Sequence, residues 1–218
     1  MTPRRFARVC HVRTIGAVLS LTLLGGCATI STLDSASAPL PTYDLGVAAG
    51  TPVRGVPTSR RVLLVAPPTA LGAFNSDRMV IKPNALQVAY LPNSRWADAA
   101  PRQIQTLLIR AIANSGAVGY VGGEGAGPTP DFVLLTDIQA FQAELEPGGE
   151  GGHVVARLAL TLVRDADRGL VGSRMLEARV PLASTEPLAV ANAFNAAMTG
   201  MLREATRWTV GAMGGRVS

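Results

Sequence analysis

The chain has 218 residues, 48% of them hydrophobic and 16% charged, and a formal net charge of +5. Four of the 20 basic residues and none of the 15 acidic residues lie before Cys27, so 16 basic and 15 acidic residues remain from Cys27 onward and leave a charge of +1. A near-neutral chain with no basic run and 5% aromatic residues excludes electrostatic recognition of nucleic acid.

The first 26 residues have the three parts of a secretory signal peptide. A basic start, MTPRRFARVCHVR, precedes an apolar run from Ile15 to Leu24 and a small-residue exit. That run is too short to span a bilayer stably, because a spanning helix needs about 20 apolar residues. The sequence LGGC ending at Cys27 resembles the lipobox of bacterial lipoproteins. The resemblance implies cleavage between Gly26 and Cys27 and acylation of Cys27. The alternatives are an ordinary signal peptide with a chance cysteine, or a buried helix of a cytosolic domain.

Processing at Cys27 predicts a membrane location for the chain and excludes several roles of cysteine. Ala28 is not the aspartate associated with inner-membrane retention in enteric bacteria, which favours the periplasmic face of the outer membrane over the inner membrane. Cys10 leaves with the signal, and an acylated Cys27 leaves no disulfide, thiolate metal site or catalytic thiol. The Ser-, Ala- and Pro-rich segment 27–41 is interpreted as a flexible tether that reaches about 20 Å. A single domain is expected over residues 42–214.

From Tyr43 onward, the hydrophobic pattern predicts about seven strands and two helices. Strands are expected at 43–45, 61–68, 77–82, 86–90, 132–145, 153–163 and 170–182, and a Pro-Asn turn joins the third and fourth as a hairpin. One helix is expected over 99–115, and a second from a cap at 184–187 to about Gly211. The buried stripe of the second helix is expected to contain Phe194, Met198, Met201, Ala205 and Trp208. These elements predict an α+β two-layer sandwich, with one mostly antiparallel or mixed sheet covered on one face by both helices.

The residues predict no catalytic, metal or cofactor site. GYVGGEGAGPTP, from Gly119 to Pro130, lacks the lysine of a phosphate-binding loop and precedes a strand, so it is interpreted as a mobile connection. His153 is the only histidine after Cys27, and no G-x-S-x-G elbow accompanies it. The acidic residues lie at turns or on the polar sides of strands, in no pattern typical of metal ligands. The chain is therefore interpreted as a protein that is not an enzyme.

The order of these elements resembles that of the auxiliary lipoproteins of ABC-type transport systems, the PqiC-like family. The similar features are the lipobox, the tether, a Tyr-x-Leu strand at 43–45, a valine-rich strand ending at Pro67, the segments DRMVIK and LQVAY, and Arg95-Trp96-Ala97 before the first helix. The alanine-rich final helix is also similar. Two departures are the proline-interrupted stretch PNALQVAYLPNSRW and the long Gly119 to Pro130 segment.

The resemblance implies a non-enzymatic role beside an ABC ATPase, a permease and an MCE-domain protein that move phospholipids or other lipids between the two membranes. The lipoprotein would anchor at the outer membrane and dock the periplasmic conduit. Arg95 and Trp96 are candidate partner contacts, or else they hold the hairpin against the first helix. Two alternatives stay open, a structural lipoprotein of another envelope machine and a tethered periplasmic hydrolase. The cargo, the direction of transport and a homo-oligomeric state also stay open.

Overall fold

The computed structural model describes residues 39–46, 59–125, 127–148 and 151–214. The signal peptide expected at 1–26, Cys27 and nearly all of the expected tether lie outside the described residues. The chain divides into two compact units, Met1–Pro39 and Leu40–Ser218. The elements described below belong to the second unit.

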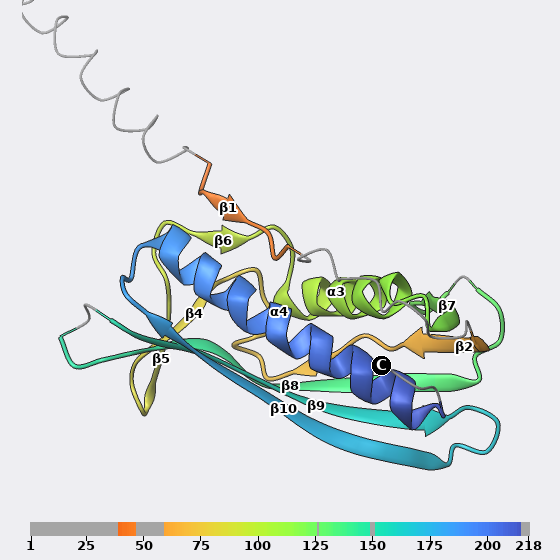
Figure 1. Ribbon diagram of the computed structural model, residues 1–218. Helices are drawn as coiled ribbons and strands as arrows, with labels where there is room; N and C mark the ends of the chain where they lie inside the picture. The colour runs from red at the N-terminus through yellow and green to blue at the C-terminus, as the bar shows by residue number, and fades with distance from the viewer. Residues whose placement is uncertain (1–38, 47–58, 126, 149–150, 215–218) are drawn as a thin grey trace, which may run out of the picture. The chain divides into compact units, whose positions relative to one another are not determined.

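A mixed sheet of eight strands forms one layer of this unit (Figure 1). Its strands are β2 (Ser59–Val65), β3 (Thr69–Ala70), β4 (Val80–Asn84), β5 (Gln87–Tyr90), β7 (Val118–Gly122), β8 (Phe132–Leu145), β9 (Gly152–Arg164) and β10 (Leu170–Leu182). The long strands β8, β9 and β10 form an antiparallel meander. The other edge of β8 pairs in parallel with β2, β3 and β4 in turn, while β7 extends the sheet beyond β2 and β5 pairs with β4.

Two helices, α3 (Ala100–Asn114) and α4 (Pro187–Ala212), form the second layer. Each has a proline in its first turn, where the missing N–H costs no intrahelical hydrogen bond. α4 packs against β9 and β10, and α3 packs against β2 and β7. This arrangement confirms the predicted α+β sandwich with both helices against one sheet. Within the described ranges, no helix is both long enough and apolar enough to cross a membrane.

The hydrophobic patterns place the core between the two layers. In β9, every second residue from Val154 to Leu162 is buried, whereas Arg157 and Thr161 on the other side are half-buried, as the alternation predicts. In α4, the predicted stripe is buried at Phe194, Met198, Met201 and Ala205, while Trp208 is half-buried against the core.

The sequence prediction missed three short strands among the described residues. β3 and β6 (Arg95–Trp96) have two residues each, and β6 pairs in parallel with β1 (Thr42–Tyr43). β7 occupies the start of the Gly119 to Pro130 segment, so the interpretation of that whole segment as a connection was wrong. Its backbone pairs with β2, and this tertiary pairing overrides the low strand propensity of glycine.

Gly152 is expected to tolerate no side chain. It has a φ of +151° and pairs with Leu145 on one side and Leu182 on the other. A Cβ at this position would overlap the backbone carbonyl oxygen of Glu144, so the strands would have to move apart. We expect Gly152→Ala to lower the free energy of unfolding by about 1–3 kcal/mol, the cost of a strained backbone, or more.

Denaturant unfolding of the purified mature protein measures this loss. Gly148→Ala is the matched control, because Gly148 in the same β8–β9 connection also has a positive φ, +104°, but nothing lies within 4 Å of its Cβ position. If the two variants unfold at the same midpoint, the overlap with Glu144 has no energetic consequence.

Candidate functional site

Arg95 and Trp96 lie where the chain enters the folded unit. In β6 they pair with Thr42 and Tyr43 of β1. The backbone N–H of Arg95 donates to the carbonyl of Pro41 at 3.2 Å. The backbone N–H of Ala97 donates to the carbonyl of Tyr43 at 2.7 Å. Because adjacent residues of a strand point to opposite sides, the two side chains diverge.

Trp96 points into the core and is 1% exposed. Its ring lies edge-on to Phe194 of α4, with 5.2 Å between ring centroids, and 6.0 Å from the ring of Phe141 of β8. The backbone N–H of Trp96 donates to the backbone carbonyl of Asp77 at 2.7 Å, which ties β6 to the segment before β4. A partner protein could not reach the indole without opening the core. The side chain therefore joins the two layers of the sandwich.

Arg95 points outward, and its side chain is about half exposed. Its guanidinium lies 3.9 Å from the Asp77 carboxylate, and its Nε donates to the Thr42 hydroxyl at 3.4 Å. Exposed ion pairs of this kind contribute only about 0–1 kcal/mol to stability. Arg95 can therefore exchange Asp77 for an acidic group of a partner at little cost.

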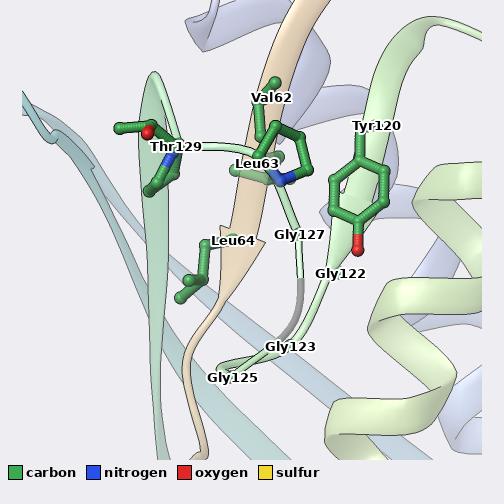
Figure 2. Close-up of a pocket in the computed structure, with 11 residues that line it drawn as sticks. Val62, Leu63, Leu64, Tyr120, Gly122, Gly123, Gly125, Gly127 and Thr129 are labelled. Carbon is green, nitrogen blue, oxygen red and sulfur yellow. The ribbon is translucent and has the colours of Figure 1, made fainter.

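A pocket of about 260 Å³ opens between β2, β7 and the glycine-rich segment that follows β7 (Figure 2). Val62 and Leu64 of β2 and the ring of Tyr120 form its apolar walls. A Cβ at Gly122 or Gly127 would lie 2.6 or 2.8 Å from the Tyr120 hydroxyl, so both glycines leave room for this ring. Tyr120 was missed by the sequence reasoning, although a lone aromatic residue in a glycine run was the available signal.

This pocket does not fit a phosphate ligand or a lipid molecule. None of the described residues that line it carries a charge, so no side chain there would neutralise a phosphate. Its volume lies below the roughly 300–1,000 Å³ of sites that enclose a drug-sized ligand. A pocket with this volume and lining suits a small uncharged group.

His153 lies near the start of β9, opposite Glu144 of β8 and Pro181 of β10. It lines a second pocket, of about 310 Å³, together with Lys82, Glu146 and Arg179. The described residues of this pocket include no serine, threonine or cysteine that His153 could activate. The Glu144 carboxylate is already engaged. It accepts hydrogen bonds from the Arg179 guanidinium at 3.3 Å and the Gln142 amide at 3.0 Å.

We expect His153→Ala to leave function nearly intact, because no serine, threonine or cysteine is among the described residues that line its pocket. The measurement is complementation of a strain that lacks the chain, with the amount of folded protein followed in parallel. His153→Gln is the control for the space that the ring fills. Loss of complementation by both variants at normal protein levels would support the hydrolase alternative.

The groups whose pKa is shifted belong to surface pairs, and they lie outside both pockets. The pKa of the Glu177 carboxyl is lowered, chiefly because it accepts a hydrogen bond of 3.0 Å from Arg157 across β9 and β10. The pKa of Asp167 is also lowered, first by the N–H of Gly169 in the β9–β10 turn. Perturbed groups can indicate active sites, but a hydrogen-bonded ion pair accounts for the shift of Glu177 and a hydrogen bond within the turn is the main cause of the shift of Asp167. Among the described residues, no three potential metal ligands gather at one place.

Comparison with known proteins gives a family match over most of the described unit. The family model described as "ABC-type transport auxiliary lipoprotein component" matches residues 43–205. The protein bll6063 of Bradyrhizobium diazoefficiens is 27% identical over 173 residues, which cover 78% of this chain and 44% of that protein. The chain thus spans less than half the length of this relative.

Among the solved structures that are similar to the chain, two illustrate the likeness. Protein XCC0632 from Xanthomonas campestris is 26% identical with a TM-score of 0.73, over 79% of this chain and 96% of that one. A second structure, of an uncharacterized protein, has a TM-score of 0.61 at 14% identity, over 78% of this chain and 97% of that one. The second likeness concerns the fold alone.

Proposed function

Because this chain belongs to the family of ABC-type transport auxiliary lipoprotein components, we propose that it is the membrane-anchored periplasmic subunit of a lipid transport system. In this proposal it docks an MCE-domain conduit at the outer membrane, and the conduit is served by an ABC permease and ATPase. The match over residues 43–205 is the observation that carries the proposal, since it extends from β1 into α4. The MCE protein and a phospholipid cargo follow from the resemblance of the elements to this family.

The proposed anchor is the acylated Cys27, and residues 27–41 connect it to the unit that begins at Leu40. The LGGC sequence and the lipoprotein character of the family support it. A docking role needs no catalytic residue, metal or cofactor. It suits the two small pockets, because neither combines a serine, threonine or cysteine with a base among its described residues.

Arg95 is the proposed contact with the conduit. It is exposed beside β1, and its existing pair with Asp77 is long and weak. Trp96 has an indirect role in this contact. Its buried ring holds β6 on the core and so sets the position of Arg95. An acidic patch on the partner would complement the guanidinium.

The test is photocrosslinking in cells that express the whole transport system. A photoreactive amino acid replaces Arg95 in one variant and Arg168, an exposed residue of the β9–β10 turn, in the control. We expect an adduct with the MCE protein from position 95 and none from position 168. An adduct with a component of another envelope machine would favour the structural alternative. No adduct with the MCE protein from position 95 would contradict the proposed contact.

A further inference from the structure

The β4–β5 hairpin carries a row of exposed apolar side chains. Leu86 is 96% exposed, Val88 53% and Tyr90 40%. They recur at every second position, so Val88 and Tyr90 share one face of β5 and Leu86 continues the row into the turn. A leucine with almost all of its side chain in water has no role in the core of this unit.

Side-chain hydrogen bonds close the turn that presents Leu86. The Asn84 side chain accepts hydrogen bonds from the N–H groups of Leu86 and Gln87, at 3.1 and 3.0 Å. Its amide also donates to the Gln87 side chain at 3.1 Å. These bonds favour one conformation of the turn, so the hairpin presents the apolar row to solvent in a fixed arrangement.

Basic and aromatic groups flank the row. The Arg78 guanidinium lies over the Tyr90 ring, 5.1 Å from its centroid, and Lys82 lies on the adjacent strand β4. A tyrosine with nearby cations beside apolar side chains is typical of a surface that rests in the headgroup region of a membrane. Three acidic groups lie nearby: Asp77 and Glu144 are each paired with an arginine, and Glu146 lines the same pocket as Lys82.

The hairpin lies at the end of the unit where the chain enters. In Figure 1, β4 and β5 lie at the same end as β1 and the first turn of α4, whereas β7 and the β9–β10 turn lie at the opposite end. That first turn adds Leu188, which is 60% exposed. Leu40 follows Cys27 by 13 residues, and the tether predicted from the sequence would reach about 20 Å. An acylated Cys27 would therefore keep this end close to the bilayer.

We infer that the β4–β5 hairpin inserts Leu86, Val88 and Tyr90 into the interfacial layer of the membrane that holds the anchor. The inference rests on the proposed acylation of Cys27. The anchor makes this contact intramolecular, so that a small apolar surface is sufficient. The contact sets which side of the unit faces the bilayer and leaves the opposite end directed away from it.

The test uses the mature acylated protein in vesicles of phosphatidylethanolamine and phosphatidylglycerol. Ala85→Cys supplies a thiol beside Leu86, and Cys27 does not compete for the label once its sulfur is acylated. Leu170→Cys, at the β9–β10 turn and also exposed, is the matched control. We expect an environment-sensitive dye at position 85 to shift to the blue on reconstitution and to lose most of its emission to brominated acyl chains. The dye at position 170 should show neither change.

A second variant tests the apolar row itself. In the Ala85→Cys background, Leu86→Gln with Val88→Gln should abolish the blue shift, while the protein still floats with the vesicles. If the protein with Ala85→Cys alone floats but its dye stays in water, the inference about the hairpin is wrong, while the proposed acyl anchor is supported. If it does not float, the anchor and the inference fail together.

Two further outcomes would indicate that the hairpin contacts a protein and not the membrane. A blue shift without quenching by brominated chains means that the hairpin contacts a second copy of the chain, which overturns the inference. A dye that leaves water only after the MCE protein is added means that the hairpin contacts the conduit. That result would overturn the membrane contact and support the proposed function.

Discussion

Phe194→Ala is expected to remove a large part of the stability of the folded unit. Phe194 has no exposed surface, and its ring lies 4.6 Å from Phe141 and 5.2 Å from Trp96, measured between centroids. The three rings come from α4, β8 and β6, so one side chain joins the helix layer, the sheet and the entry strand. Truncating a buried phenylalanine costs about 3–5 kcal/mol. Domains of this size are stable by about 5–15 kcal/mol.

Denaturant and thermal unfolding of the purified mature protein measure this effect. Leu188→Ala is the control, because Leu188 lies in the same helix but is 60% exposed. A substitution at such a surface position usually changes stability by less than about 0.5 kcal/mol. If Phe194→Ala unfolds at the midpoint of the parent protein, the aromatic cluster is not part of the stabilising core.

Cys27→Ser is expected to abolish the membrane attachment of the chain. The serine hydroxyl lacks the thiolate that makes cysteine a strong nucleophile, so the diacylglyceryl group cannot be added. Lipid anchoring generally needs more than one signal, and this variant would lose every acyl chain. Intact mass and membrane fractionation give the result. The parent protein should begin at Cys27 with added acyl mass and stay with the membrane, whereas the variant should lack that mass and be released.

Cys10→Ser is the matched control for the anchor, because Cys10 precedes the expected cleavage site and would be absent from the mature chain. We expect this variant to be processed and anchored like the parent protein. A soluble periplasmic product of the parent chain that begins at another residue would contradict the lipobox interpretation.

The long elements could be predicted because their patterns are local. The strands expected at 132–145, 153–163 and 170–182 lie within one residue of β8, β9 and β10, and both helices lie close to their expected bounds. Their periodicity repeats over enough residues to indicate the type of element. The short strands lack such a pattern. β7 contains two glycines and exists because its backbone pairs with β2, which lies far away in the sequence.

The Arg95-Trp96 pair shows how far the motif itself was informative. The sequence singled out both residues as candidate contacts, but it could not tell which side chain is exposed to solvent. Alternation in a strand separates the two side chains, and the direction of each depends on the neighbouring elements. Trp96 is buried because Phe141 and Phe194 meet it from β8 and α4, which leaves Arg95 outside.

The amino-acid sequence by itself determined the near-neutral charge from Cys27 onward, the lipobox-like LGGC, and the long strands and helices. It also determined the likeness to a family of transport lipoproteins, which the match over residues 43–205 confirms. Only the tertiary structure decided which apolar side chains are covered. Leu86 and Val88 belong to an apolar segment that, as a pattern, resembles any core strand. Both are nevertheless exposed, and β4 is the only partner of β5 among the described strands. Local periodicity reports which residues share a face, whereas exposure depends on what packs against that face.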